Sequence, residues 1–407
     1  MRSCWEAKAA GSMRGMKKTT VETSETPMRR LLAETRKRQN AMLKSLEELV
    51  QCESPSHDKA AVDRCGAIVA REWRRRGATV RVLKQKTRGN HVRAEMGGER
   101  LRAAGQILVL GHIDTVYPLG DLKKNPFRVA KGRAWGPGTF DMKGGLVLAM
   151  CAIDALRAAG VAPAKRLVFL WTSDEEIGSE SSRAAIESEA RRSDAVLVLE
   201  PSLGPKGKVK TERKGVGGAE IIVTGRSAHA GIEPEKGVNA VHEMALQVGR
   251  LMRMNDPRRG ITVQTTVIAG GTVSNVVPDS ARADVDIRIS RMTDAAGIER
   301  KLHALRPILK GAKVEVRGGI NRPPLERTAA VQKLFTHARG LAAAMGSKLE
   351  EASTGGGSDG NLTAALGIPT LDGLGAVGNG AHTPHEHVVV RALPARAALI
   401  AGLLASL

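Results

Sequence analysis

The sequence predicts a mixed α/β fold: a largely parallel sheet flanked by helices, with a smaller ferredoxin-like α+β domain inserted into it. The first observation is a set of short, continuously apolar runs at residues 106–110, 166–171 and 195–199. Such runs are typical of strands that are buried on both faces. The second observation is a helical pattern at residues 144–159, between the first and second runs. This alternation indicates crossover connections between parallel strands.

The third observation is a different pattern in the middle of the chain. We expect strands at 219–223, 261–268, 281–289 and 312–317, and helices at 237–254 and 294–309. This β-α-β-β-α-β order is that of the split ferredoxin-like motif. We therefore expect a catalytic domain formed by residues 28–211 and 321–407, and an inserted domain at 212–320.

The remaining elements belong to the predicted α/β domain. We expect a strand at 79–82 and helices at 30–52, 58–76, 329–345, 362–366 and after Leu393. Residues 1–27 are polar and mixed, and we expect them to be a disordered extension. They contain no apolar segment of a secretory signal, which favours a cytoplasmic protein.

Composition narrows the classes of partner. The net charge is +21 at pH 7, but the basic residues are scattered and aromatic residues make up only 2% of the chain. This argues against a nucleic-acid stacking surface and favours a solvated basic surface. No apolar run is long enough to span a membrane. The four cysteines form no CxxC pair, so a thiolate zinc site is not expected.

Polar residues follow each of the three apolar runs. His112 and Asp114 follow the first, Glu175 and Glu176 follow the second, and Glu200 ends the third. Sites in open α/β sheets collect beyond the carboxyl ends of strands, so we expect these residues to share one site. In an extended segment His112 and Asp114 face the same way. His112 could thus bind a metal while Asp114 orients its ring.

Three further segments remain open on the residues alone. Asp141, in the glycine-rich GPGTFDMKGG, could bridge two cations or simply cap the following helix. Glu175 and Glu176 could divide the roles of general base and ligand, or be solvated carboxylates at a helix start. In GNGAHTPHEH, any of His382, His385 and His387 could be a ligand, or the turn could be ordinary surface.

Taken together, the motifs GHIDTV, GPGTFDMKGG, SDEEIGS, LEP, GRSAHAG and GNGAHTPHEH resemble those of a known family. It is the dinuclear zinc peptidase family that includes glutamate carboxypeptidase, acetylornithine deacetylase and succinyl-diaminopimelate desuccinylase. The resemblance runs from about residue 40 to the end. It implies two Zn²⁺ ions per subunit, for which Co²⁺ or Mn²⁺ could substitute. The implied ligands are His112, Asp141 and Glu200 for one ion, and Asp141, Glu176 and His382 for the other.

The resemblance also implies roles around the metals. Glu175 would be the general base, and His229 would stabilise the oxyanion in the active site of a partner subunit. Asn275 resembles a second partner-side contact, so the inserted domain would be both a lid and a homodimer interface. Glu386 fits the family's glutamate after the last histidine ligand.

Candidate carboxylate-binding residues complete the predicted site. A guanidinium can grip a carboxylate with two hydrogen bonds, which singles out Arg288 and Arg322. Gly357, in a glycine-rich turn, offers backbone N–H groups to an anion. We expect hydrolysis of an amide bond in a small peptide or N-acyl amino acid with a free carboxylate, most similar to the glutamate carboxypeptidase branch.

Three alternatives to this function stay open. The closest is an N-acyl amino acid deacylase that uses the same site. The others are an inactive hydrolase scaffold that binds nucleic acid and a metal-stabilised scaffold without chemistry.

Overall fold

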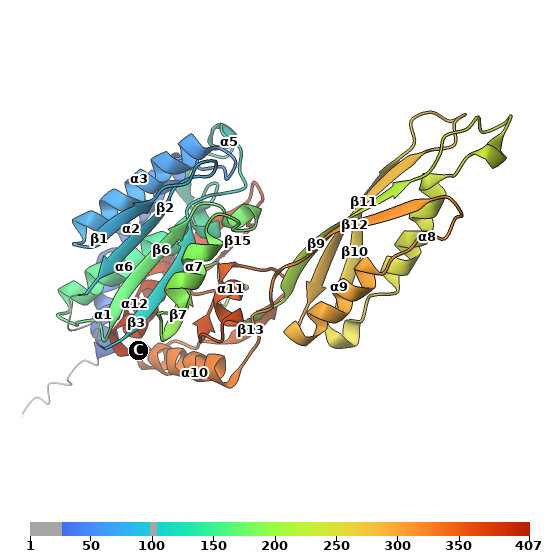
Figure 1. Cartoon of the computed structure of the whole chain (residues 1–407). Helices are drawn as coiled ribbons and strands as arrows, with labels where there is room; N and C mark the ends of the chain where they lie inside the picture. The colour runs from blue at the N-terminus through green and yellow to red at the C-terminus, as the bar shows by residue number, and fades with distance from the viewer. Residues whose placement is uncertain (1–26, 98–103) are drawn as a thin grey trace, which may run out of the picture.

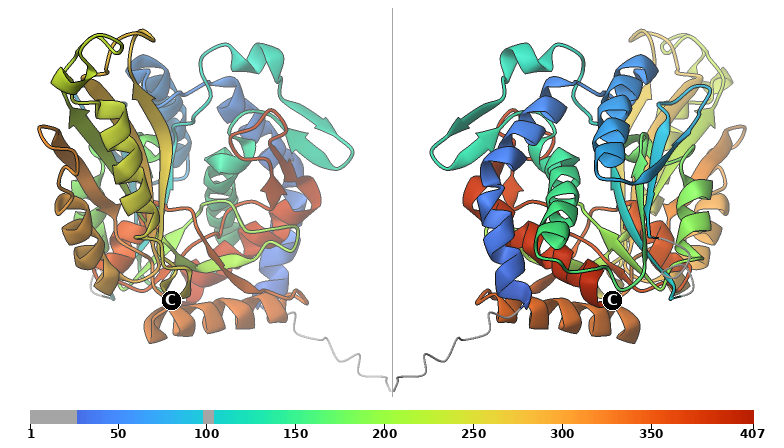
Figure 2. Two further views of the ribbon diagram at one scale, coloured as in Figure 1. Left: turned by 90° about the vertical axis from the view of Figure 1, so that its right-hand side faces the viewer. Right: turned by 90° about the vertical axis from the view of Figure 1, so that its left-hand side faces the viewer.

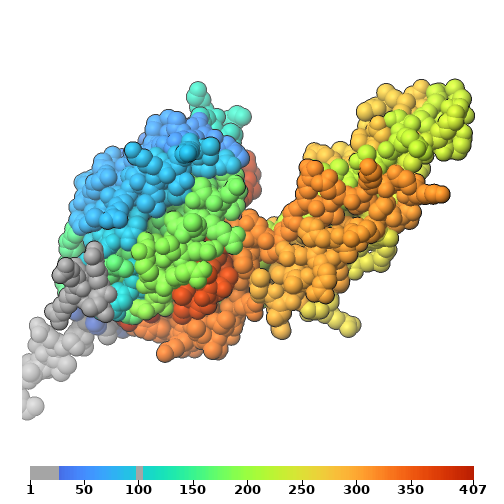
Figure 3. All heavy atoms as spheres, in the orientation of Figure 1, coloured from blue at the N-terminus to red at the C-terminus, as the bar shows by residue number. Residues whose placement is uncertain are grey.

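The structure, a computed structural model, describes residues 27–97 and 104–407. It has a compact body and an insert that extends away from it, joined by a narrow connection (Figures 1 and 3). The expected disorder of the N-terminal extension concerns residues that lie outside the described ranges, except that Pro27 already begins a helix. Among the described residues, every helix is too short or too polar to span a bilayer.

The body is built on a six-stranded sheet with the order β1-β2-β6-β3-β7-β14. Its strands are β1 (Thr79–Leu83), β2 (His91–Met96), β3 (Gln106–His112), β6 (Arg166–Thr172), β7 (Ala195–Val198) and β14 (Thr370–Leu371). The three predicted apolar runs are β3, β6 and β7, which pair in parallel, as does β14 with β7. Only the pairings of β1 with β2 and of β2 with β6 are antiparallel, which confirms a mixed, largely parallel sheet.

Alternate residues of the central strand pack into separate core clusters. Ile107 and Val109 face the larger cluster, whereas Leu108 and Leu110 face a smaller one. The larger cluster contains residues of α1 (Pro27–Lys37), α2 (Gln39–Gln51), α3 (Lys59–Arg75), α6 (Gly144–Ala158), α10 (Ala329–Ala344) and α12 (Leu393–Ser406). The smaller cluster contains residues of α7 (Arg183–Ala190) and α11 (Asp359–Ala365). The sheet is therefore buried on both faces, as its continuous apolar runs predict.

One predicted helix of the body is in fact two helices. The pattern at 30–52 predicts one helix, but the chain forms α1 and α2 with a break at Arg38. Next to the break, the buried Thr35 hydroxyl donates to the carbonyl oxygen of Pro394 in α12, at 2.8 Å. This tertiary contact joins segments far apart in the chain, so hydrophobic periodicity does not reveal it.

The insert is a four-stranded antiparallel sheet with the order β10-β11-β9-β12. Its elements are β9 (Gly215–Thr224), α8 (Ala240–Met252), β10 (Thr262–Gly270), β11 (Ser280–Ile289), α9 (Ala295–His303) and β12 (Lys313–Arg322). The chain order and strand order are those of the predicted ferredoxin-like motif. Helix α9 ends at His303, earlier than predicted, shortly before Pro307, which cannot continue a helix.

The hydrophobic patterns of the sequence do not predict several short strands of the body. They are β4 (Arg128–Ala130), β5 (Arg133–Trp135), β8 (Val209–Arg213), β13 (Glu351–Thr354), β15 (Gly378–Asn379) and β16 (His387–Val389), with the short helix α5 (Asp121–Lys124) nearby. Strand β16 pairs with β5, which joins the C-terminal segment to the chain just before Asp141. In both views of Figure 2 the β4–β5 hairpin projects on the side away from the insert.

The insert has a hydrophobic cluster of its own, and this generates a stability prediction. Ile221 is fully buried in that cluster. We expect Ile221→Ala to lower the free energy of opening of insert peptides by about 2–5 kcal/mol, because the substitution leaves a cavity. Hydrogen exchange followed by mass spectrometry measures this, and peptides of β3 and β6 should be unchanged.

The matched control is Ile232→Ala, since the Ile232 side chain is 73% exposed. It should change the opening free energy by less than about 0.5 kcal/mol. If Ile221→Ala lowered the opening free energy of the central sheet as much as that of the insert, the separation of the two cores would be contradicted.

Candidate metal centre

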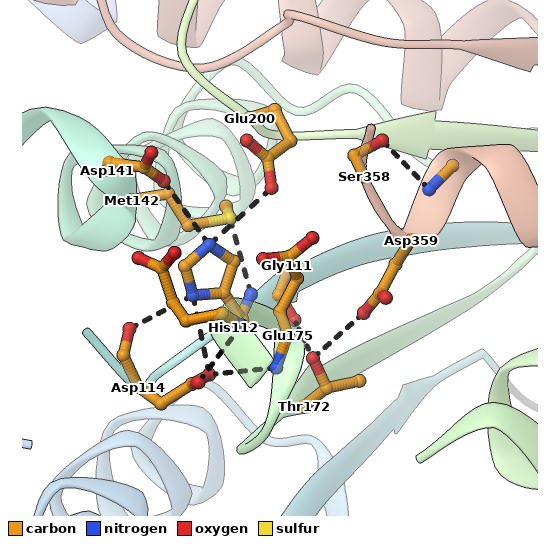
Figure 4. A network of polar contacts seen from close by, with 12 residues as sticks. Gly111, His112, Asp114, Asp141, Met142, Thr172, Glu175, Glu200, Ser358 and Asp359 are labelled. Atoms are coloured by element: carbon orange, nitrogen blue, oxygen red, sulfur yellow. Dashed lines mark hydrogen bonds and ion pairs between the residues drawn. The ribbon is translucent and has the colours of Figure 1, made fainter. Parts of the chain in front are cut away.

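The carboxyl ends of three parallel strands meet at one edge of the central sheet. His112 is the last residue of β3 and lies in register with Thr172, the last residue of β6. A single 3-10 turn at Glu175–Ile177 follows β6, and Glu200 lies two residues beyond the end of β7. The strand-end residues that the sequence singles out are therefore neighbours, as Figure 4 shows for His112, Glu175 and Glu200.

Two groups of potential ligands share one carboxylate. In the first, His112 Nε2 lies 3.3 Å from Asp141 Oδ1 and 3.5 Å from Glu200 Oε1. In the second, His382 Nε2 lies 3.4 Å from Asp141 Oδ2 and 3.2 Å from Glu176 Oε2. Within each group the ligand atoms all lie within 4.8 Å of one another. Asp141 turns one oxygen to each group, as a bridging carboxylate must.

Unpartnered polar atoms test whether metals fit these groups. Among the buried side-chain atoms of the described residues that have no hydrogen-bond partner, three belong to these ligand groups: His112 Nε2, Asp141 Oδ1 and Glu176 Oε1. A buried polar group without a partner typically costs about 1–3 kcal/mol, and more if it is charged. Imidazole nitrogens with carboxylate oxygens are ligands that zinc, cobalt and manganese accept. The residues present therefore fit a pair of divalent cations.

Asp114 organises two parts of the site. The Nδ1 atom of His112 lies 3.0 Å from the Asp114 backbone oxygen and 3.4 Å from its Oδ1. The Asp114 carboxylate also accepts a 2.7 Å bond from Ser56 Oγ and 3.3 Å bonds from the backbone N–H groups of Glu175 and Glu176. One buried carboxylate thus faces the His112 ring and holds the turn that carries both glutamates.

Asp141 is held by a glutamate from the other end of the chain. Helix α6 begins only at Gly144, so the interpretation of Asp141 as its N-cap is wrong. Instead, Glu386 Oε1 accepts bonds from the backbone N–H groups of Phe140 and Asp141, at 2.7 and 2.8 Å. Burial raises the pKa of Glu386 to about 7. The sequence pattern includes Glu386 but does not reveal this anchoring.

Without metals the centre retains protons. Burial raises the pKa of Glu176 to about 8. Hydrogen bonds with Asp141 and Glu176 raise the pKa of His382 to about 10. Burial opposes the charged form of His112, but Asp114, Asp141 and Glu200 outweigh it and raise the pKa of that imidazole well above its usual value. The raised pKa values favour protons at the positions that a cation would take.

The three histidines of the C-terminal motif have different environments. His382 lies against the Asp141 and Glu176 carboxylates. The His387 ring packs on Trp135, with centroids 4.5 Å apart, and its Nδ1 lies 2.9 Å from the His385 carbonyl oxygen. Neither His385 nor His387 belongs to a ligand group among the described residues. The geometry thus favours His382 as the ligand.

Glu175 is paired with an arginine at the end of β12, where the chain returns from the insert to the body. Arg322 Nη1 donates to Glu175 Oε1 at 2.6 Å, and Nη2 donates to the Glu175 carbonyl oxygen at 2.8 Å. Nη2 also donates to Ser179 Oγ at 2.7 Å, and Nη1 lies 3.4 Å from Asp359 Oδ1. Burial raises the pKa of Asp359 to about 7. Arg322, expected to bind a substrate carboxylate, therefore already has an acidic partner.

The other two predicted substrate-binding residues are Arg288 and Gly357. Arg288 donates to Asp286 and, at 3.3 Å, to the Gly355 carbonyl oxygen of the body. Gly357 lies near Arg322, whose Cδ would be 3.5 Å from a Cβ at that glycine. Both candidates are thus close to the junction between the body and the insert.

His229 and Asn275 form a separate pair in the insert. The exposed His229 accepts bonds at Nδ1 from the backbone N–H groups of Gly231 and Ile232, and the Asn275 carbonyl oxygen accepts from Ala230. These residues follow β9 and β10, whose connecting loops form the outer tip of the insert (Figure 1). The structure therefore brings His229 and Asn275 together, but away from the metal centre of the same chain.

Comparisons with known proteins agree with this arrangement. Residues 108–406 match the model of peptidase family M20/M25/M40. The chain is 33% identical over 374 residues to carboxypeptidase G2 of Pseudomonas sp. (strain RS-16), covering 91% of this chain and 90% of the relative. It is 31% identical over 319 residues to a succinyl-diaminopimelate desuccinylase of Dechloromonas aromatica, covering 73% and 82%.

Solved structures share the fold at lower identity. An aminopeptidase PepT of Bacillus cereus aligns with a TM-score of 0.74 and 23% identity, over 90% of this chain and 98% of that one. A dinuclear metal-binding M20 peptidase of Bacillus subtilis aligns with a TM-score of 0.66 and 16% identity, over 91% and 98%. Since the family model covers most of the chain and a relative with 33% identity covers nearly all of it, the resemblance expected from the motifs is confirmed. This chain is a metallopeptidase and belongs to the peptidase family M20/M25/M40.

Proposed function

We propose that the protein is a glutamate carboxypeptidase-like exopeptidase, which cleaves an amide bond in a small peptide or N-acyl amino acid with a free carboxylate. The observation that carries the proposal is the position of Asp141 between two ligand groups, with the Glu175 carboxylate left outside both. Similarity to carboxypeptidase G2 supports the exopeptidase, and similarity to the desuccinylase supports a deacylase as the second candidate.

We assign the two ligand groups to two zinc ions. His112, Asp141 and Glu200 would hold one, and Asp141, Glu176 and His382 the other. When bound, such ions polarise a carbonyl group and lower the pKa of water. Asp114 would keep the His112 ring in position, and Glu386 would hold the backbone on either side of the bridging carboxylate.

Glu175 is our candidate for the general base. Its neighbour Glu176 faces His382, whereas the Glu175 carboxylate faces Arg322 and is in neither ligand group. In the reaction Glu175 would take a proton from the attacking water and pass it to the leaving amine. Because Arg322 is paired with Glu175, it would bind a substrate carboxylate only after releasing the Glu175 carboxylate. Arg288 and Gly357, at the same junction, would complete the carboxylate-binding region.

We assign residues 28–211 and 321–407 to a catalytic domain and residues 212–320 to a lid and dimerisation domain. His229 belongs to the loop that follows β9, and this loop lies at the outer tip of the insert (Figure 1). We propose that His229 reaches the metal centre of a partner subunit in a homodimer. There it would stabilise the oxyanion, with Asn275 beside it. Exposed apolar side chains on α8 and β10, namely Leu246, Met252, Val267 and Ile268, support association through this domain.

A substrate panel tests the proposed activity. The zinc-loaded protein is assayed with N-acyl glutamates, dipeptides, N-acetylornithine and N-succinyl-diaminopimelate, with the α-carboxylate either free or amidated. We expect cleavage of substrates with a free carboxylate and a preference for a C-terminal glutamate. Turnover of N-acetylornithine or N-succinyl-diaminopimelate alone would favour the deacylase, and no metal-dependent turnover would contradict both candidates.

The role of Glu175 generates a prediction about the chemical step. We expect Glu175→Gln to lower kcat by about 10²–10⁴-fold, because proton transfer loses its base. Metal content, measured by mass spectrometry, should be unchanged. The matched control is Glu180→Gln, at an exposed position nearby, which should retain kcat. Full activity of Glu175→Gln with normal metal content would remove Glu175 from the mechanism.

The raised pKa values predict that metal binding depends on pH. Since the pKa of His382 is raised to about 10 and that of Glu176 to about 8, both groups hold protons at pH 7 in the metal-free protein. Ligands must lose their protons to bind, so zinc affinity should rise with pH and fall as the solution becomes more acidic. Calorimetry in two buffers of different ionisation enthalpy measures the number of protons that zinc binding releases. Zinc binding without proton release would contradict the assignment of His382 and Glu176 as ligands.

A further inference from the structure

A cavity with a volume of about 890 Å³ lies next to the segments that carry the candidate metal ligands. Its walls come from the β4–β5 hairpin, the turn at residues 202–207, the end of α10 and the start of α12. No residue that we assign to metal binding or proton transfer lines it. The volume is within the range of about 300–1,000 Å³ that is typical of small-molecule sites. The cavity is therefore separate from the site described above and large enough for an organic ligand.

The lining of this cavity has charges of one sign. Its cationic side chains are Lys131, Arg133, Lys206, Lys348, Arg391 and Arg396, and no aspartate or glutamate of the described chain lines it. Lys206 and Lys348 are partly neutralised by Glu350, at 3.7 and 3.0 Å. No ion pair is found for Lys131 or Arg391 within the described ranges. The wall thus presents positive charge that the protein itself does not balance.

Arg396 places one of these charges inside the protein. Its side chain is buried, with the residue 6% exposed. Nε donates to the Gly375 carbonyl oxygen at 2.8 Å, Nη1 donates to that of Gly207 at 3.0 Å, and Nη2 donates to that of Gly373. All three partners are backbone carbonyls, and no carboxylate is paired with Arg396 in the described chain. Burial lowers the pKa of this guanidinium to about 10. A buried charge without a counter-ion is unfavourable, and an anion in the cavity would supply one.

A purely structural role explains only part of this arrangement. Arg396 clamps three loop carbonyls, which would suffice to retain it. That role does not require Lys131 and Arg391, which are exposed at the same cavity without acidic partners. The wall also contains apolar side chains, among them Phe140 and Leu399. Charge and apolar surface together suit an organic anion better than a bare inorganic ion.

We propose that this cavity binds a small organic polyanion, which has several carboxylate or phosphate groups, at a site distinct from the metal centre. The cationic lining would hold the anionic groups, and the apolar wall would contact the organic part. This inference does not depend on the proposed peptidase substrate.

The cavity is also well placed to influence the metal centre. Phe140 precedes Asp141, Ser202 follows Glu200 by two residues, and Asn379 precedes His382 by three. Phe140, Ser202 and Asn379 all line the cavity. A bound anion would therefore touch the segments that carry the candidate ligands without replacing any ligand.

Calorimetry on the zinc-loaded full chain tests the proposal. The probes are benzene-1,3,5-tricarboxylate and a sugar bisphosphate, with acetate as a singly charged control. We expect saturable binding of a polyanion and no competition by acetate. The double variant Lys131→Gln/Arg391→Gln should weaken binding by at least about tenfold, since two charge-assisted hydrogen bonds are lost. Tighter binding of one probe identifies the anionic group that the site prefers.

Two controls make the test decisive. Arg300→Gln/Lys301→Gln removes the same charge from the exposed face of α9 and should change affinity less than about twofold, as screened surface charges do. His112→Ala disrupts the metal centre and should retain polyanion binding. Equal weakening by both double variants, loss of binding in His112→Ala, or no saturable binding would overturn the proposal.

Discussion

The position of the Asp141 carboxylate is the constraint on which the rest of the site depends. One side chain must face two ligand groups, so its backbone needs to be placed accurately. Gly138 adopts a positive φ of 69°, and a Cβ at Gly144 would lie 2.6 Å from the Thr139 carbonyl oxygen. Glu386 then binds the N–H groups of Phe140 and Asp141 from the opposite end of the chain. The glycines allow the turn, and the buried glutamate holds it.

The sequence predicts those features of the fold and the site that have local or periodic signals. Apolar runs locate β3, β6 and β7, and their shared direction places His112, Glu175 and Glu200 at one edge. Residue types alone leave His382, His385 and His387 equivalent, because only the pairing of β16 with β5 determines where each of them lies. The Arg322–Glu175 pair is likewise not predictable, since it joins residues 147 positions apart. Lys143 is a similar case: its buried ammonium donates to the Leu49 and Cys52 carbonyl oxygens.

The residues that we propose for the active site are divided between the two lobes. Glu175 and the ligand groups belong to the body, whereas His229 and Asn275 belong to the loops that follow β9 and β10, at the outer tip of the insert (Figure 1). The insert has a hydrophobic core of its own, separate from that of the body. Arg322 ends β12 and contacts Glu175, which connects the insert physically to the proposed base. The orientation of the insert and the environment of the base are therefore expected to change together.

The most direct test of the central claim is the zinc content of variants, measured by mass spectrometry after dialysis against a weak chelator. If Asp141 bridges both ions, Asp141→Ala should lose both, whereas Glu200→Ala should lose mainly the ion held with His112. Retention of one tightly bound ion by Asp141→Ala, or equal loss of both ions in Glu200→Ala, would contradict the account.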